Sequence, residues 1–346
     1  MLLPLAVRWL RMRRRLTALL GPAIAVVLLL SVVVKLPYFS EGPGPAHNVV
    51  PLIKVEEHRT YPTSDRILLT TVSFSGDRLT PLGLVRAWLD PKEDIVPEHD
   101  YLSPGETLQQ ESELQGYAMD QSQLDATVVV LTQVAGYPKN HGAGALIEGT
   151  LEGCDAFGKL FPGNVVTSVD GQPVPDGHAA SRLIDAVPTG EPIRFEAQAG
   201  EKSVTVELVR KPCGPHDENF VGVSLTNSFP FEVSMSSGGV GGPSAGLLFG
   251  LGLYDLLTPG DLTGGSVVAG TGELWPDGTV HPIGGVQKKL YGAKAAGAGT
   301  FLVPTDNFEE AKRAGVEGIR LVPVSNFEEA LAALRGDTVS IASGGA

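Results

Sequence analysis

Residues 241–251 form the stretch GGPSAGLLFGL, a glycine-rich turn that leads directly into an apolar helix predicted over Ser244–Leu257. Pro243 favours the first helical turn, so Ser244 is expected at the helix start. A serine there lies beside backbone N–H groups and the positive end of the helix dipole. An acyl-transfer nucleophile and its oxyanion hole need these groups, although an ordinary capping serine fits the same stretch.

The five residues 242–246 also match G-x-S-x-G, the nucleophile elbow of α/β-hydrolases. That elbow follows a buried strand directly, whereas here SSGGVGG precedes the serine. The one downstream histidine, His281, comes too soon to follow an acid on a separate strand. The sequence therefore disfavours a Ser-His-acid site.

A serine without a histidine needs another base, and a lysine can serve if burial lowers its pKa toward neutrality. Lys294 and Lys312 are expected on solvated helix faces, which leaves Lys288 and Lys289 as the remaining candidates after the serine.

Four stretches in order, GGPSAGLLFGL, AGTGEL, HPIGGVQKKL and GAGTFLVPTDNFEEA, resemble the proteolytic domain of Lon proteases. The resemblance implies a Ser-Lys dyad of Ser244 and Lys289, with Thr271 supporting the lysine. Backbone N–H groups around Gly242 and Ala245 would then stabilise the oxyanion.

Two positions depart from the Lon pattern without removing the dyad. Gly241 stands where ATP-dependent members often have Asp, and His281 where a small or apolar residue is common. No G-x-x-x-x-G-K-[ST] motif occurs, so no ATPase module is expected. Two cysteines are too few for a multi-cysteine zinc site, and we expect neither a cofactor nor a metal.

Residues 140–212 contain the run FPGNVVTSVDG (161–171) and resemble a PDZ domain, a module that binds extended peptides at a sheet edge. Asn164 replaces the usual Asp, and a small β-sandwich without a ligand is the alternative. Cys154 and Cys213 bracket the module. They could pair in an oxidising compartment or remain free thiols.

The N-terminus combines a basic segment with the apolar run Leu16–Val34. Residues 1–35 carry six basic and no acidic side chains, so the net charge of −13 is the sum of +6 in this segment and −19 in the remainder of the chain. The negative net charge argues against nucleic-acid binding. About 19 helical residues suffice to cross a bilayer, and the arginines place this end in the cytoplasm. A removed signal peptide or a buried soluble helix is the alternative. We predict a cytoplasmic basic tail at 1–15, a transmembrane helix at 16–36 and a linker at 37–47.

The predicted fold class is α+β: a Lon-type domain with a β-rich PDZ domain, behind one transmembrane helix. Residues 214–337 are the expected proteolytic core and 338–346 a tail. By family resemblance this core is too short. The strand Arg66–Phe74 and the helix Met119–Ala135, within 48–135, would therefore supply its N-terminal part, with the PDZ domain inserted. A separate membrane-proximal domain is the alternative.

A structural criterion accompanies that hypothesis: a 66–74 strand outside the sheet that holds 231–234 would exclude the insertion. The polar segment Glu93–Glu113 is predicted to be a loop.

These features resemble the PDZ-containing, ATP-independent Lon-like proteases of bacterial envelopes. We expect a membrane-anchored serine endopeptidase with an extracytoplasmic catalytic part, acting on envelope or membrane-associated proteins. Its PDZ domain would present a substrate tail or gate access. The family resemblance adds a hexameric ring as a further expectation. A non-catalytic PDZ scaffold is the alternative, and the presence of both Ser244 and Lys289 disfavours it.

Overall fold

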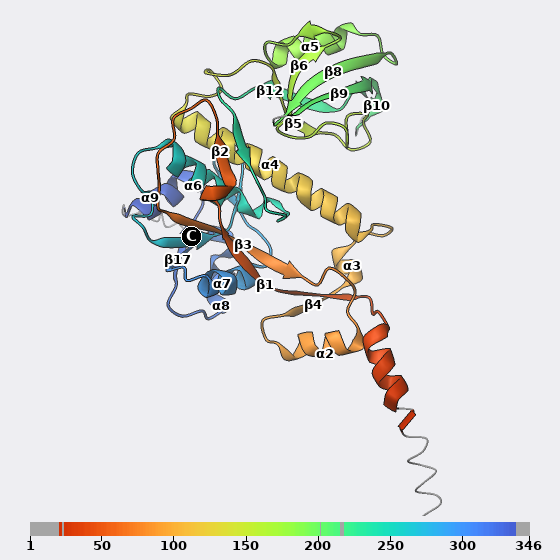
Figure 1. The fold of residues 1–346 in the computed structure, drawn as a ribbon, viewed down its shortest axis with the longest axis vertical. Coiled ribbons are helices and arrows are strands. Elements are labelled where there is room, and N and C mark those ends of the chain that lie inside the picture. Colours follow the sequence, from red (N-terminus) through yellow and green to blue (C-terminus); the bar gives the residue numbers. More distant parts are fainter. Residues whose placement is uncertain (1–20, 23, 201, 215–217, 337–346) are drawn as a thin grey trace, which may run out of the picture. The chain divides into compact units, whose positions relative to one another are not determined.

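The computed structural model describes residues 21–22, 24–200, 202–214 and 218–336 (Figure 1). The predicted tails at 1–15 and 338–346 lie outside these residues. The described chain divides into two units. The first comprises residues up to 43 together with 72–108, and the second comprises 44–71 together with 109 onward.

A parallel sheet forms the centre of the second unit. Strand β14 pairs with β3 on one side and β17 on the other, and β17 pairs with β18. Successive side chains alternate between the two faces: Ile67 and Leu69 join one hydrophobic core, while Leu68 joins another. Both faces are therefore buried, as is usual for parallel sheets. The strands are β3 (Arg66–Phe74), β14 (Val267–Gly270), β17 (Thr300–Pro304) and β18 (Arg320–Val324).

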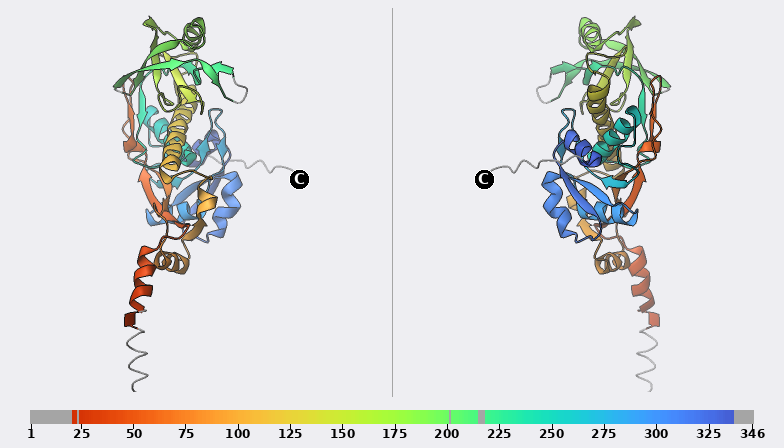
Figure 2. Two further views of the ribbon diagram at one scale, coloured as in Figure 1. Left: turned by 90° about the vertical axis from the view of Figure 1, so that its right-hand side faces the viewer. Right: turned by 90° about the vertical axis from the view of Figure 1, so that its left-hand side faces the viewer.

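Helices cover both faces of this sheet (Figures 1 and 2). Residues of α4 (Leu108–Val134), α6 (Gly246–Leu257) and α9 (Phe327–Arg335) contribute to the core on one face. Residues of α7 (Val286–Ala295) and α8 (Phe308–Arg313) contribute to the core on the other. Short elements connect them: η1 (Val50–Leu52), β15 (Glu273–Leu274), β16 (Val280–His281) and η3 (Thr305–Asn307).

Helix α4 begins earlier than predicted. The sequence indicated a helix from Met119 and a loop over Glu93–Glu113, but α4 starts at Leu108, after β4 (Asp94–Pro97) and α3 (Glu98–Tyr101). The loop prediction is therefore wrong. Side-chain hydrogen bonds four residues apart, such as Gln115 to Glu111 at 2.7 Å, stabilise the polar first turns that lack an apolar stripe.

Residues before the β-rich segment pair with residues after it. Strand β2 (Ile53–Val55) pairs antiparallel with β13 (Val233–Met235), and β3 pairs with β14. Strands β3 and β13 lie in different sheets, so the result of the test that we set for the insertion goes against it. The Asp65 carboxylate nevertheless accepts hydrogen bonds from the N–H and hydroxyl of Thr263, at 2.6 and 2.7 Å, 198 residues along the chain.

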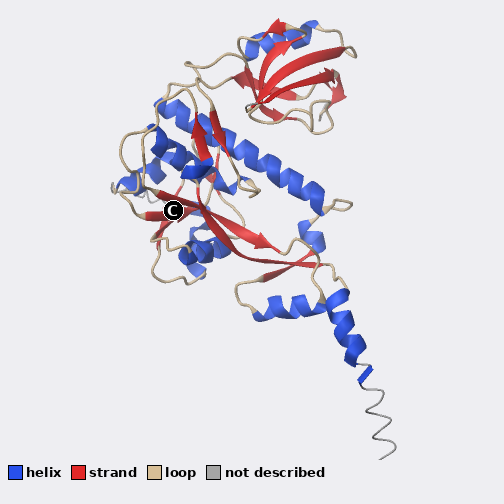
Figure 3. Ribbon diagram, in the orientation of Figure 1, coloured by secondary structure: helices blue, strands red, loops and turns tan. Residues whose placement is uncertain are grey.

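The β-rich module, residues 143–228, consists mainly of strands (Figure 3). Its sheet has the order β12-β5-β6-β8-β9, with β7 beside β6, and α5 shares its hydrophobic core. The module extends past the predicted end at 212, because β12 pairs with β5. The elements are β5 (Ala145–Thr150), β6 (Val165–Val169), β7 (Gln172–Pro173), α5 (Gly177–Ala186), β8 (Pro192–Ala199), β9 (Lys202–Val209) and β12 (Val223–Asn227).

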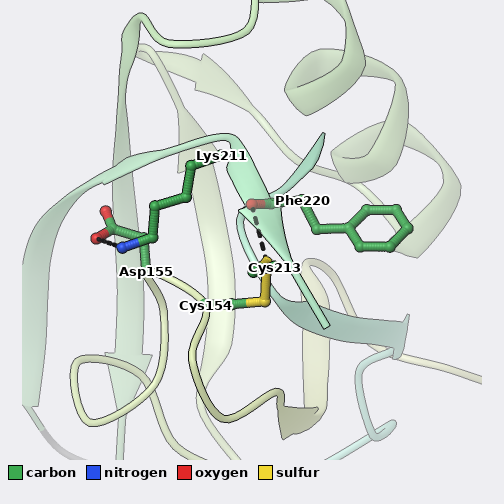
Figure 4. The surroundings of a disulfide bond; sticks show 5 residues. All are labelled: Cys154, Asp155, Lys211, Cys213 and Phe220. Atoms are coloured by element: carbon green, nitrogen blue, oxygen red, sulfur yellow. Dashed lines mark hydrogen bonds and ion pairs between the residues drawn. A yellow bond between two sulfur atoms is a disulfide. The ribbon is translucent and has the colours of Figure 1, made fainter. Parts of the chain in front are cut away.

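Cys154 and Cys213 form a disulfide in this module, at the end of β10 (Lys211–Cys213), which pairs with β11 (Glu218–Phe220) (Figure 4). Asp155, which follows Cys154 in the chain, accepts a hydrogen bond from the Lys211 ammonium at 3.3 Å. The structure thus decides between paired and free thiols in favour of the pair.

Strand β1 (Tyr38–Asn48) begins in the first unit, where the sequence predicted a linker at 37–47. That prediction is wrong because β1 pairs with β4 and places the fully buried Phe39 against Phe74 and Tyr101. Helix α2 (Pro81–Leu89) follows the N-cap Thr80.

Residues 21–22 and 24–33 are helical, and their large apolar side chains are exposed. No helix within the described residues is both long enough and apolar enough to cross a bilayer. Residues 16–20 and 23 of the predicted span lie outside the described residues.

Candidate active site

Ser244 lies in a single 3-10 turn, η2 (Pro243–Ala245), that leads into α6. The turn follows Gly242, whose φ of 86° and ψ of 155° are almost restricted to glycine. The Ser244 carbonyl accepts from the Gly272 N–H at 2.9 Å and from the Thr271 hydroxyl at 3.0 Å. The end of β14 therefore fixes the backbone that carries the serine.

Helix α7 brings Lys289 to the same point. Its Nζ lies 2.6 Å from Ser244 Oγ and 3.1 Å from Thr271 Oγ1. Lys289 is only 4% exposed and Thr271 is fully buried, whereas Ser244 is partly exposed. The three residues that the Lon resemblance implied are thus brought together, with the hydroxyl of the serine accessible.

Burial sets the protonation of this lysine. Because the charged ammonium loses its hydration, the pKa of Lys289 falls from 10.5 to about 7. Near neutral pH the neutral amine is therefore well populated, and it lies at hydrogen-bond distance from a hydroxyl. This is the arrangement required of a general base and a serine nucleophile.

One of the two backbone N–H groups predicted to stabilise the oxyanion is already hydrogen-bonded within the protein. The Gly242 N–H donates to the Gln115 carbonyl of α4 at 2.7 Å, so it is already engaged in this structure. Ala245 is buried at the junction with α6. The Gly242 N–H can therefore serve an oxyanion only after it leaves Gln115.

Helix α4 contributes a further support that the sequence did not assign. The Ser122 hydroxyl, which is buried, donates to the Pro243 carbonyl at 2.7 Å. A Cβ on Gly246 would lie 2.5 Å from Ser122 Oγ, so this glycine permits the close approach of α4 and α6. The sequence signal for this contact is weak, because Ser122 is one of several polar side chains in the first turns of the helix that we predicted over 119–135.

Two other candidate lysines and the downstream histidine make contacts away from Ser244. Lys294 Nζ donates to the Gly318 carbonyl at 2.9 Å, and Lys312 Nζ pairs with Glu309 at 2.7 Å. His281 stacks on Trp275 and contacts the Thr279 hydroxyl at 2.9 Å. Lys289 Nζ, by contrast, lies beside Ser244 Oγ. Within the described ranges no cluster of three His, Cys, Asp or Glu side chains is arranged to hold a metal ion.

Comparison with known families matches residues 229–335 to the Lon protease (S16) C-terminal proteolytic domain. The chain is 44% identical over 66 residues to a Lon protease of Koribacter versatilis, covering 19% of this chain and 8% of that protein. It is 38% identical over 82 residues to Lon protease 2 of Bacillus subtilis, covering 23% and 14%. The chain thus matches only a small part of the length of these relatives. These matches support a serine peptidase.

Among solved structures, the chain is similar to the PDZ domain of an SdrC-like protein from Listeria innocua. The sequence identity is 18%, the match covers 24% of this chain and 92% of that one, and the TM-score is 0.22. A corresponding PDZ domain from Listeria monocytogenes matches with 15% identity and the same TM-score of 0.22, covering 24% and 87%.

Proposed function

We propose that this chain is a membrane-anchored serine endopeptidase that cleaves envelope or membrane-associated proteins without ATP, through a dyad of Ser244 and Lys289. The contact that carries the proposal is the 2.6 Å separation between Lys289 Nζ and Ser244 Oγ, made by a lysine whose pKa burial lowers to about 7.

Acylation uses both members of the dyad. The neutral amine of Lys289 takes the proton of Ser244 Oγ as the oxygen attacks the scissile carbonyl carbon. The tetrahedral oxyanion is stabilised by backbone N–H groups at the start of α6, where the helix dipole is positive. The C–N bond then breaks, and the ammonium of Lys289 returns the proton to the departing amine.

Deacylation reverses these roles with water. Lys289 takes a proton from the water that attacks the acyl-serine ester. The ester C–O bond then breaks to release the acid, and the ammonium of Lys289 gives the proton to Ser244 Oγ, which regenerates the serine. Thr271 holds both partners in place, because its hydroxyl contacts Lys289 Nζ and the Ser244 carbonyl.

Two features support an extracytoplasmic position for the catalytic part. The basic N-terminal segment precedes an apolar run, which favours an anchor whose N-terminus stays in the cytoplasm. The Cys154–Cys213 disulfide is typical of an oxidising compartment.

The β-rich module is proposed to present a substrate tail or gate access, as a PDZ domain would. A cleft of about 700 Å³ supports this role, because residues of the module, of α4 and of the segment 228–235 line it. Tyr117 of α4 binds the module directly: its hydroxyl accepts from the Thr150 N–H at 2.7 Å. A ring of six copies remains a prediction from the resemblance to Lon proteases.

The test is proteolysis of casein and of a fluorogenic peptide by the full-length chain in detergent, with and without ATP. Ser244→Ala and Lys289→Ala should abolish turnover, and Lys294→Ala, whose side chain lies elsewhere on α7, should retain it. ATP should change nothing. Equal turnover in all variants would contradict the dyad, and would leave a non-catalytic scaffold as the better explanation.

A further inference from the structure

Helix α2 in the first unit exposes a continuous apolar face. Leu82, Val85, Trp88 and Leu89 are 56%, 49%, 74% and 68% exposed. Their spacing of three and four residues places them on one side of the helix. The buried Ala87 lies on the opposite side. A soluble surface rarely presents so much apolar area on a single short helix, so something is expected to cover it.

The position of α2 indicates what covers this face. The Leu36 N–H donates to the Leu79 carbonyl at 2.8 Å, and the Leu79 N–H donates to the Tyr38 carbonyl at 2.7 Å. Lys35 pairs with Asp77 at 2.8 Å. These contacts attach the residues just before α2 to the end of the N-terminal apolar helix, and α2 begins at that point (Figure 1).

The N-terminal helix also has no apolar partner within the described part of the chain. The large apolar side chains from Ile24 to Val33 are about half exposed or more. A helix that is apolar all round is stable where a nonpolar medium surrounds it. The exposed face of α2 starts where that helix ends, so the two apolar surfaces belong to one region of the first unit.

The chemistry of α2 matches the boundary between headgroups and acyl chains. Trp is enriched at that boundary, because its ring is apolar and its N–H is polar. Arg86 is exposed on the same helix and can extend its guanidinium to lipid phosphates while its stem packs on apolar groups. Short helices with an apolar face and a basic side chain bind in the plane of the interface.

We infer that α2 lies in the membrane–water interface on the extracytoplasmic side of the bilayer that holds the anchor. The side chains inserted among the lipid acyl chains are Leu82, Val85, Trp88 and Leu89. This inference rests on the proposed membrane anchor and adds a second lipid contact that fixes the first unit at the bilayer surface.

The test uses the full-length chain in phosphatidylcholine–phosphatidylglycerol vesicles, with part of the lipid brominated near the top of the acyl chains. Bromine quenches a tryptophan that contacts it. The chain has three tryptophans, Trp9, Trp88 and Trp275. Wild type is compared with Trp88→Phe and with the matched control Trp275→Phe. Both substitutions replace exposed rings and preserve the fold.

Trp88→Phe should lower the fraction of fluorescence that brominated lipid quenches, because it removes the ring that is proposed to lie among the acyl chains. Trp275→Phe should not lower it. Equal quenching in wild type and Trp88→Phe would overturn the inference. So would a Trp88 that is shielded from aqueous iodide but not quenched by brominated lipid, since a protein would then cover α2.

Flotation of the vesicles separates this inference from the anchor itself. A chain that fails to float with the vesicles contradicts the anchor, and the α2 contact with it. A chain that floats but shows no quenching of Trp88 contradicts the α2 contact alone.

Discussion

Lys289 Nζ and Ser244 Oγ are 2.6 Å apart although 45 residues separate them in the chain. The serine comes from the turn before α6 and the lysine from α7, on the other face of the sheet. The two meet at the end of β14, where Thr271 contacts both. The dyad therefore depends on the sheet as well as on the two motifs.

The first prediction concerns the pH dependence of peptide cleavage. The base is the neutral amine, which exists above the pKa of Lys289, so kcat/KM should rise with pH through a midpoint near 7. A pH profile on a fluorogenic peptide measures this. Asp125→Asn is the control, because burial raises the pKa of that carboxyl to about 6. The midpoint near 7 should persist in this variant, and its loss would assign the limb to Asp125.

The second prediction concerns the free energy of unfolding of Lys289→Met. The folded-state pKa of Lys289 is depressed, so the unfolded chain binds more protons between pH 7 and 10.5, and wild-type stability rises with pH across that window. Removing the buried amine should therefore stabilise the protein at pH 7, by at most about 5 kcal/mol.

Denaturant unfolding between pH 7 and 10.5 checks this second prediction. The gain of Lys289→Met over wild type should shrink as the pH rises, and the exposed control Lys294→Met should show no such trend. A gain that is constant with pH would mean that packing rather than charge burial is responsible.

The third prediction concerns Thr271. Replacing it with valine keeps the size of the side chain but removes the hydroxyl that contacts Lys289 Nζ and the Ser244 carbonyl. Losing these buried hydrogen bonds should lower kcat by roughly 10- to 100-fold, with little change in KM. Thr271→Ser restores the hydroxyl and should recover most of the rate. Unchanged turnover in Thr271→Val would show that the lysine needs no such support.

The fourth prediction concerns the turn before the nucleophile. Gly242→Ala adds a Cβ at a φ of +86° and 2.9 Å from Gln115 Oε1, so the backbone of the turn is strained and the Gln115 side chain must move. We expect a loss of stability of about 1–3 kcal/mol and a reduced rate of acylation. The control Gly239→Ala also has a positive φ, of +84°, but its Cβ meets nothing within 4 Å. Reaction with a fluorophosphonate probe compares the two, and equal labelling rates would contradict a special role for Gly242.

The fifth prediction concerns the disulfide. Replacing Cys154 and Cys213 together with alanine should destabilise the β-rich module by about 2–4 kcal/mol, since the bridge closes a long loop. Thermal unfolding with and without reductant measures this. Reductant should lower the melting temperature of wild type and leave the double variant unchanged. A shift of equal size in both would point to an effect unrelated to this bridge.

The resemblance to Lon motifs was sufficient to select Ser244, Thr271 and Lys289, three residues that the structure brings together. It was not sufficient for the contacts of Gln115 and Ser122, since those depend on how α4 packs beside a turn 121 residues away from Ser122. A local sequence pattern does not show which residues of α4 come to lie beside this turn.

Two predictions for the N-terminal half were wrong because they relied on local composition, whereas the structure there depends on residues far away in the chain. Proline and glycine at 42–45 suggested a linker, yet β1 forms there because Tyr38–Glu41 pair with β4 more than 50 residues later. The polar segment before Met119 likewise looked like a loop, whereas its helix is an extension of the buried part of α4.

The pairing of β3 with β14 has a consequence for how the protein matures. A chain made from its N-terminus holds residues 66–69 long before their partners at 267–270 exist. The β-rich module, whose strands all lie within 143–228, can close in the meantime. The proposed dyad is assembled only when β14 and α7 have joined the early strand, so a chain that ends before α7 holds the serine without its base.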